Sequence, residues 1–356
     1  VKTQLPSPLG PSKRAPSNFL LAEEEKVYGD RCASGFRKLK LLGKGGCAVV
    51  WLCEDLHTGQ LVAVKQVPKS HNFRQKAAIE ACKREIFFCS SLEKAESKHL
   101  TRLLGQFSDR HDLWAIYELG GVSLSKALFE LKGEFCRGER LYRVHHLPLY
   151  EQFCNDAQSW KQFLRDALEA LETLNSYSVV HADIKPDNVL VDKENYHGLK
   201  LVDFGSAFSF ASSGNLSSAT PEYLPPEALE LLAESVPEQI SVLSSVSHPW
   251  SFDMWSLGMI VLEVASGLPL WLSFKARVSR GTRQYKGKGL LAVSGRVPSL
   301  VLREQFNIVE NLKSVLQQCV GLPLGESGID FLSKLLAWHP RDRISPTEAL
   351  EHAYLR

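Results

Sequence analysis

One stretch does most to indicate the fold of this chain: His181-Ala182-Asp183-Ile184-Lys185-Pro186-Asp187-Asn188. Short apolar runs flank it on both sides, Val179-Val180 before it and Val189-Leu190-Val191 after it. Runs rich in β-branched residues predict buried strands, so we expect the polar stretch to be a loop held at both ends. Such a loop gathers two carboxylates, an ammonium group and an amide within a few residues.

A second motif, Asp203-Phe204-Gly205, follows Asn188 by fifteen residues. That interval suits a β-hairpin that returns the chain to the same point. Because Mg²⁺ prefers carboxylate and other hard oxygen ligands, Asn188 and Asp203 are the candidate metal ligands. Beside them, Asp183 is the candidate acceptor for the proton of a hydroxyl group, and Lys185 is the candidate counter-ion for a phosphoryl group.

A glycine-rich segment lies near the start of the chain, Gly43-Lys44-Gly45-Gly46-Cys47-Ala48-Val49-Val50. Glycines between two strands let backbone N–H groups approach phosphates closely. Further on, Lys65 ends an apolar run, and a lysine that leaves a buried strand needs an anionic partner. Phosphates and a helix carboxylate can both serve. On the helix predicted over 72–96, Glu85 is the preferred partner and Glu80 the alternative.

Three features of the second half are expected to be structural rather than catalytic. The segment Thr220-Pro221-Glu222-Tyr223-Leu224-Pro225-Pro226-Glu227 ends in a glutamate that we expect to pair with Arg343. Asp253, on a helix predicted over 253–266, is expected to brace the loop at 181–188 from a buried position.

The composition suits a globular protein with a full core, since 44% of its 356 residues are hydrophobic and 23% are charged. A net charge of +2 is too small to indicate nucleic acid or a membrane surface as the main partner. The best candidate for a membrane segment, 259–272, is interrupted by Glu263 and Pro269. None of the eight cysteines forms a C-x-x-C pair, so we expect reduced thiols and an intracellular protein, cytoplasmic or nuclear.

In this order and spacing, the motifs resemble those of the eukaryotic protein kinase family, of the serine/threonine type, over about residues 36–355. The resemblance implies transfer of the γ-phosphoryl group of ATP to serine or threonine hydroxyls of protein substrates, with Mg²⁺. It assigns Asp183, Lys185 and Thr220 to catalysis, and Asn188 and Asp203 to the metal. It implies that ATP is bound by Leu42, Gly43, Lys44, Gly45, Gly46, Ala48, Val50, Ala63, Lys65, Glu85, Tyr117, Glu118, Gly120 and Leu190.

Two residues carry the resemblance to serine/threonine kinases: Lys185, two residues after Asp183, and Thr220, which matches the threonine that bonds the catalytic aspartate and lysine in such enzymes. Within the family, the segment 203–207 and the catalytic loop resemble the splicing-factor and dual-specificity-regulated kinases of the CMGC group. The segment 220–224 is closer to the AGC group. Both subgroup assignments stay open at this point.

The resemblance implies an α+β bilobal fold, with a small antiparallel sheet and one main helix in the N-lobe and a larger, mainly helical C-lobe. The pattern agrees, because strands are predicted between Phe36 and Lys65 and helices at 159–177, 226–234, 253–266, 308–319 and 328–337. We divide the chain into a flexible tail at 1–34 and a kinase domain at 35–356, with the N-lobe at about 35–119 and the C-lobe at about 120–356. Within the tail, Phe19-Leu20-Leu21-Ala22 before Glu23–Lys26 is either a short docking helix or part of a solvated tail.

The sequence departs from the family pattern in two places. Ala182 replaces the usual arginine, which in many kinases receives a phosphate of the activation loop. We therefore expect activity without phosphorylation of the loop at 206–220. The stretch 122–158 is unusually long, and it is either a docking insert for protein substrates or a solvated excursion.

Two other classes of function compete with an active protein kinase. A pseudokinase, which acts as a scaffold or binding module, usually lacks one of the key residues, but Lys65, Asp183, Asn188 and Asp203 are all present. A small-molecule kinase is disfavoured by the segment 220–227, which suits a peptide platform.

Overall fold

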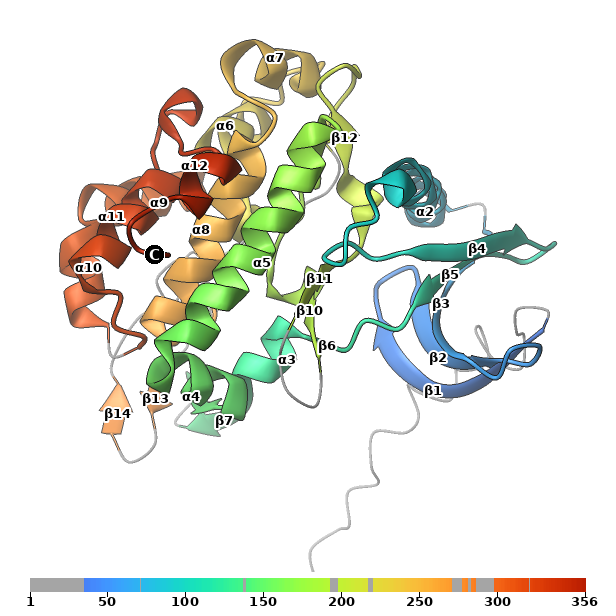
Figure 1. The fold of residues 1–356 in the computed structure, drawn as a ribbon, viewed down its shortest axis with the longest axis horizontal. Coiled ribbons are helices and arrows are strands. Elements are labelled where there is room, and N and C mark those ends of the chain that lie inside the picture. The colour runs from blue at the N-terminus through green and yellow to red at the C-terminus, as the bar shows by residue number, and fades with distance from the viewer. Residues whose placement is uncertain are drawn as a thin grey trace, which may run out of the picture.

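The computed structural model describes residues 35–356 except 71, 137–138, 193–197, 217–219, 271–276, 281–282, 286–297 and 320. The predicted flexible tail at 1–34 lies outside the described residues. The described chain has two parts, a strongly curved sheet with one long helix and a larger helical part (Figure 1). This is the bilobal arrangement that the sequence predicts.

The first part is a five-stranded antiparallel sheet in the order β1-β2-β3-β5-β4. Its strands are β1 (Phe36–Lys44), β2 (Val49–Asp55), β3 (Leu61–Pro68), β4 (Leu103–Ser108) and β5 (Asp112–Glu118). Helix α2 (Phe73–Leu92) packs against β3, β4 and β5, and its N-cap Asn72 accepts a hydrogen bond from Gln75 N at 2.7 Å. The helix predicted over 72–96 is confirmed; its last residues belong to a short 3-10 turn, Glu93–Ala95.

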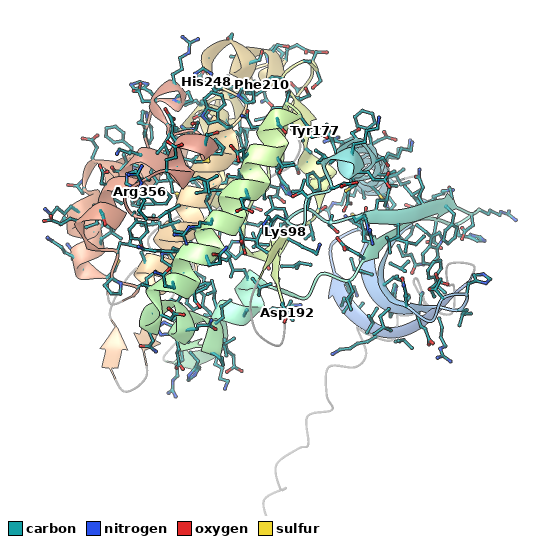
Figure 2. The ribbon with its side chains drawn as sticks, viewed as in Figure 1. Lys98, Tyr177, Asp192, Phe210, His248 and Arg356 are labelled. Atoms are coloured by element: carbon teal, nitrogen blue, oxygen red, sulfur yellow. The ribbon has the colours of Figure 1, made fainter. Side chains whose placement is uncertain are left out.

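The second part is built around helix α8 (Ser251–Ser266), in which all 16 residues are buried. A helix that is apolar on every side is expected at the centre of a bundle. The other described helices are α3 (Leu124–Leu128), α4 (Pro148–Asn155), α5 (Ala157–Ser176), α6 (Pro226–Ala233), α7 (Gln239–Val246), α9 (Pro298–Glu310), α10 (Leu312–Gln318), α11 (Gly325–Leu335) and α12 (Pro346–Leu350). Figure 2 shows side chains filling the space between α5, α8 and α11.

Helix α8 and helix α11 approach closely at Gly258. A Cβ atom at this position would lie 2.7 Å from Leu336 Cδ2 and 3.0 Å from Leu335 Cβ. The predictions at 159–177, 226–234, 253–266 and 328–337 agree with α5, α6, α8 and α11 within a few residues. The helix predicted at 308–319 is wrong as one element, because the chain ends α9 at Glu310 and starts α10 at Leu312.

Short strands hold the loops between these helices. Strand β9 (Val179–Val180) pairs with β12 (Phe208–Ser209), and β10 (Val189–Val191) pairs with both β11 (Leu199–Leu201) and β6 (Val122–Ser123). The β10–β11 pair is the hairpin predicted from the interval between Asn188 and Asp203.

The long stretch after the first sheet is largely regular structure. Strands β7 (Phe129–Cys136) and β8 (Glu139–His146) form a hairpin, and β8 pairs in parallel with β13 (Arg277–Arg280), which pairs with β14 (Arg283–Tyr285). Phe129 and Val144 of this hairpin are buried. The described part of 122–158 therefore contains regular structure, and its role as a docking insert or a solvated excursion stays a prediction. Among the described residues, no helix combines the length and apolar character needed to cross a membrane.

Candidate active site

Asp253 of α8 holds the start of the loop at 181–188. Its two carboxylate oxygens accept hydrogen bonds from the backbone N–H groups of His181 (2.7 Å) and Ala182 (3.0 Å). Burial raises the pKa of the Asp253 carboxyl, although these two bonds and His181 act against that rise. Ala182 has φ of +64°, an unusual value for a residue with a side chain. The predicted brace is present, and it fixes a strained turn just before Asp183.

Asp183 is oriented by three side chains. Lys185 Nζ donates to Asp183 Oδ2 at 2.7 Å and to Thr220 Oγ1 at 2.8 Å, and Thr220 Oγ1 donates to Asp183 Oδ1 at 3.1 Å. Asn188 Nδ2 donates to both Asp183 O (2.9 Å) and Asp183 Oδ2 (3.0 Å). The structure thus brings together all three residues to which the sequence assigned catalysis, with a carboxylate held in one orientation.

The β10–β11 hairpin brings Asp203 back to Asn188. Val202 N donates to Asn188 O at 3.0 Å, and Val202 O accepts from His181 Nε2 at 3.1 Å. Asp203 follows in the left-handed region at φ +68°, and Phe204, fully buried, packs against the His181 ring with 4.7 Å between centroids. The Asp203 side chain remains 44% exposed, so its carboxylate is accessible.

Lys65 joins the two parts of the molecule. Its Nζ lies 2.6 Å from Glu85 Oε2 and 3.0 Å from Asp203 Oδ1. Burial acts against the charge of Lys65, but the Asp203 and Glu85 carboxylates outweigh it and raise the pKa of Lys65. Lys65 in turn holds the pKa of Asp203 below its usual value. Of the two glutamates considered from the sequence, Glu85 forms the pair, whereas Glu80 pairs with Lys83 on the exposed face of α2.

The burial of Glu85 shows how strongly this pair is enclosed. Its side chain is 4% exposed, and burial raises the pKa of the Glu85 carboxyl against the opposing effect of Lys65. The Tyr117 phenol is buried close by, and burial together with the Glu85 charge raises its pKa far above the usual range. Tyr117, on the neighbouring strand β5, thus lies close to the Lys65–Glu85 pair.

The glycine-rich turn connects β1 and β2, with Gly45 N donating to Ala48 O at 2.9 Å. A Cβ atom on Gly43 or Gly46 would meet nothing within 4 Å. The protein's own packing therefore does not require glycine at these two positions. Their small size leaves an open backbone cradle that a phosphate could fill. Leu42 and Val50 lie on either side of this turn, both partly buried, and Lys44 is exposed.

The connection between the two parts begins at the end of β5. The Glu118 carboxylate accepts hydrogen bonds from Arg102 N (3.0 Å) and Lys200 Nζ (2.8 Å), so its side chain is engaged within the protein. At Gly120 a Cβ atom would lie 2.7 Å from Leu190 Cδ1. Ala63 is paired with Tyr117 across β3 and β5. These residues, which the resemblance assigns to ATP binding, therefore lie at one junction.

The segment 220–227 is anchored to the bundle at two residues, Tyr223 and Glu227. Arg343 donates from both terminal nitrogens to the Glu227 carboxylate, each at 2.7 Å, and its side chain is fully buried. This predicted pair is present. A second anchor was not foreseen: Tyr223 OH donates to Glu263 Oε2 at 2.5 Å. Burial raises the pKa of Glu263 to about 7. The signal in the sequence is one acidic residue, Glu263, within the otherwise uncharged run 254–266.

The loop at 206–220 is tied to the start of α7, which was also not foreseen. Gly214 N donates to Glu238 Oε2 at 2.8 Å, and Leu216 N donates to Gln239 Oε1 at 3.0 Å. Ile240 N returns a bond to Gly214 O at 3.0 Å. These backbone acceptors and donors carry no sequence signature, because the bonds depend on which side chains the fold places opposite the loop.

Comparison with known proteins supports the same identification. The family model described as "Protein kinase domain" matches residues 36–355. One relative is an Aurora kinase of Encephalitozoon cuniculi, which is 26% identical over 89% of this chain and 92% of the relative. The human dual specificity tyrosine-phosphorylation-regulated kinase 4 is 23% identical over 93% of this chain and 59% of the relative. The mouse mitogen-activated protein kinase 15 is 28% identical over 88% of this chain and 52% of the relative. The chain spans little more than half of the last two. One of these names matches the dual-specificity branch that the catalytic loop resembles. By its motifs, its fold and the match over residues 36–355, the chain belongs to the protein kinase family.

Proposed function

We propose that this protein is an active serine/threonine kinase, which transfers the γ-phosphoryl group of ATP to hydroxyl groups of protein substrates. The observation that carries the proposal is the unbroken chain of contacts from Glu85 through Lys65 to Asp203, beside the complete Asp183–Lys185–Thr220 set. A module that only binds partners does not need both of these sets of contacts side by side.

In the proposed reaction, the oxygen of the substrate hydroxyl bonds to the γ-phosphorus, and the bond from that phosphorus to the bridging oxygen breaks to release ADP. Asp183 accepts the hydroxyl proton, and Lys185 neutralises charge on the transferred group. Lys65 would hold the other phosphates, and the backbone between Gly43 and Gly46 would cover them.

The donor set at Asn188 and Asp203 fits Mg²⁺, because both residues offer oxygen atoms and the Asp203 carboxylate is accessible. When bound there, the metal would supply positive charge that neutralises the phosphates of ATP. Lys65 would continue to orient Asp203 through its contact at 3.0 Å.

The decisive test is transfer of radiolabelled phosphate from ATP to a library of serine, threonine and tyrosine peptides. We expect labelling of serine or threonine peptides by the wild type and a loss of at least about a hundredfold in the Asp183→Asn variant. Two matched variants on α2 test the role of the Glu85–Lys65 pair. Glu85→Gln should lower the rate of transfer, and Glu80→Gln, on the exposed side of the helix, should leave this rate unchanged. A wild type that binds ATP without transfer would favour the pseudokinase alternative.

We further propose that activity does not require phosphorylation of the loop at 206–220. The side chain of Ala182 is 3% exposed and packs in an apolar cluster with Phe208, Leu224 and Phe252. An apolar cluster offers no site for a phosphate. The backbone of the loop is instead supported by Glu238 and Gln239 at the start of α7.

Phosphatase treatment tests this second proposal. Treated enzyme should keep its activity, whereas Glu238→Ala with Gln239→Ala should lower it by releasing the loop. A large loss on dephosphorylation of the loop would overturn the proposal.

Three further assignments belong with this function. We place the kinase domain at 35–356, with its lobes meeting near 119–120, and a tail at 1–34. We place the protein inside the cell, in the cytoplasm, the nucleus or both. No disulfide is formed by Cys47, Cys53, Cys82, Cys89, Cys154 or Cys319. We also propose that the insert at 122–158 docks protein substrates. Replacing Arg137, Arg140 and Arg143 together should then weaken turnover of a protein substrate and spare a short peptide.

A further inference from the structure

A group of three side chains outside the candidate active site brings one imidazole and two carboxylates to a single point. His99 lies in the segment between the short turn Glu93–Ala95 and β4, and Asp166 and Glu169 lie on α5. His99 Nε2 is 3.0 Å from Glu169 Oε2 and 3.8 Å from Asp166 Oδ1. The three ligand atoms all lie within 4.8 Å of one another, and within the described part of the chain no other three histidine, cysteine or acidic side chains meet in this way.

The hydrogen bonds of the His99 ring decide which of its nitrogens faces the carboxylates. His99 Nδ1 lies 3.1 Å from the backbone oxygen of Leu199. Because a carbonyl oxygen can only accept, Nδ1 carries the hydrogen, and Nε2 is the atom left for a proton or a metal ion. Histidine ligands of metals typically donate their other ring N–H to a backbone carbonyl or a carboxylate in this way.

Asp166 is oriented by a bond of its own. Gln162 Nε2, one turn earlier on α5, donates to Asp166 Oδ1 at 2.8 Å, and carboxylate ligands of metals are commonly hydrogen-bonded in this manner. The side chains of His99 and Asp166 are 5% and 7% exposed, whereas that of Glu169 is 45% exposed. Two buried, oriented groups and one accessible group provide a preformed site with an entry path from solvent.

The two carboxylates need more positive charge than one proton supplies. Asp166 and Glu169 are three residues apart on α5, so they lie on one face of the helix, where like charges repel. A hydrogen on His99 Nε2 can bond to Glu169 at 3.0 Å, but Asp166 at 3.8 Å is beyond hydrogen-bond distance. Lys98, labelled in Figure 2, lies 3.9 Å from Glu169, but its side chain is 75% exposed, and such surface pairs are weak.

We propose that His99, Asp166 and Glu169 bind a divalent transition-metal ion, for which Zn²⁺ is the best fit, with water as the fourth ligand. Imidazole nitrogen and carboxylate oxygen are both ligands of Zn²⁺, whereas Mg²⁺ and Ca²⁺ prefer oxygen alone. Ligand atoms at about 2.1 Å from a tetrahedral ion lie roughly 3.4 Å from one another. This spacing falls between the two distances from His99 Nε2, 3.0 and 3.8 Å.

The bound ion would tie α5 to the segment that connects α2 with the sheet. That segment is already joined to β11 by backbone bonds, from Leu201 N to His99 O (2.8 Å) and from Thr101 N to Leu201 O (3.0 Å). Leu199, which orients the His99 ring, belongs to the same strand. The ion would therefore stabilise the folded chain at a point where three segments meet. This effect does not depend on the proposed function.

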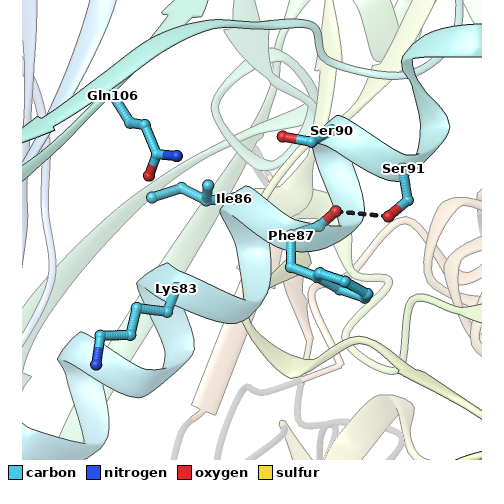
Figure 3. Close-up of a pocket in the computed structure, with 6 residues that line it drawn as sticks. All are labelled: Lys83, Ile86, Phe87, Ser90, Ser91 and Gln106. Atoms are coloured by element: carbon cyan, nitrogen blue, oxygen red, sulfur yellow. Dashed lines mark hydrogen bonds between the residues drawn. The ribbon is translucent and has the colours of Figure 1, made fainter.

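The largest open hollow on α2 is not a second site of this kind. The hollow, of about 550 Å³, is lined by Lys83, Ile86, Phe87, Ser90, Ser91 and Gln106 (Figure 3). None of these residues carries a carboxylate, an imidazole or a thiol. A metal ion therefore finds no ligand of these types there, although the hollow is roomy.

Calorimetric titration of the metal-free full chain with Zn²⁺, in the absence of nucleotide and Mg²⁺, tests the proposal. We expect one tightly bound ion per chain, and a melting temperature about 4 °C higher at a free Zn²⁺ concentration of roughly a hundred times Kd. His99→Asn keeps a donor for Leu199 O and removes the ligand, so it should weaken binding at least about tenfold. Glu169→Gln, at a half-exposed position that tolerates change, should do the same. Glu172→Gln is the control, since Glu172 lies on the same helix but bonds to Thr347, and it should bind like the wild type.

X-ray absorption at the zinc edge identifies the ligands. We expect nitrogen and oxygen neighbours at about 2.0–2.1 Å and no sulfur neighbour at about 2.3 Å. A sulfur neighbour would assign the ion to cysteines and overturn the proposal. Equal binding by the wild type, His99→Asn and Glu169→Gln would also overturn it, and so would a chain that binds no Zn²⁺, in which a proton on His99 would be the only partner of the carboxylates. None of these measurements needs catalysis, so they stay valid if the protein transfers no phosphate.

Discussion

The buried carboxyl of Glu263 should make the stability of the protein depend on pH. Burial raises the pKa of Glu263 from 4.5 to about 7, against the bonds from Tyr223 OH and Leu270 N. The folded protein therefore binds one proton more than the unfolded chain between these two pH values. The contribution of Glu263 to the free energy of unfolding is therefore most favourable below pH 4.5 and falls as the pH rises toward 7, by about 3 kcal/mol in total.

The variant Glu263→Gln removes this titration and keeps an oxygen that can accept the bond from Tyr223. We expect the free energy of unfolding of the wild type to fall by about 3 kcal/mol more than that of the variant between pH 4.5 and 7.5. Urea titrations followed by tryptophan fluorescence at several pH values measure this difference. Glu351→Gln, at an exposed position, is the control and should track the wild type. Parallel curves for wild type and Glu263→Gln would refute the reasoning.

Three further substitutions test the packing around the site. Glu227→Gln leaves the fully buried guanidinium of Arg343 without its counter-charge, and urea unfolding should show a loss of about 3–5 kcal/mol. Gly258→Ala places a methyl group 2.7 Å from Leu336, and it should cost about 1–3 kcal/mol and lower the melting temperature. Ala182→Arg should lose at least about 3 kcal/mol, because it buries an unpaired charge; a variant as stable as the wild type would show that the cluster around Ala182 can open.

The sequence predicts those parts of the fold that depend on local pattern. The alternation of β3 and the apolar face of α5 can be read directly from residue spacing. The break between α9 and α10 cannot, because it depends on the backbone of a single residue, Asn311, while helical periodicity continues across it. The parallel pairing of β8 with β13 is likewise hidden, since two short strands far apart in sequence carry no sign of their pairing.

The candidate site likewise has features that the local sequence predicts and features that only the fold reveals. Glu85 could be preferred over Glu80 as the partner of Lys65, because it lies on the predicted helix at the spacing from the lysine that is usual in the family the chain resembles. Glu263 looked like an interruption of an apolar helix, and only the fold reveals Tyr223 opposite its carboxylate. The support of the 206–220 loop by Glu238 was hidden for the same reason.

The residues around Ala182 decide what the replacement of the usual arginine by alanine implies. An arginine lost from an otherwise polar pocket would leave the loop without a means of ordering. Here the methyl group of Ala182 lies within an apolar cluster that includes Phe208 of the loop itself, and Gly214 is bonded to Glu238. We propose that this burial and these backbone hydrogen bonds supply the order that elsewhere requires a phosphate. Because order of this kind needs no phosphate, we expect control of the proposed kinase activity to act elsewhere than on the loop at 206–220.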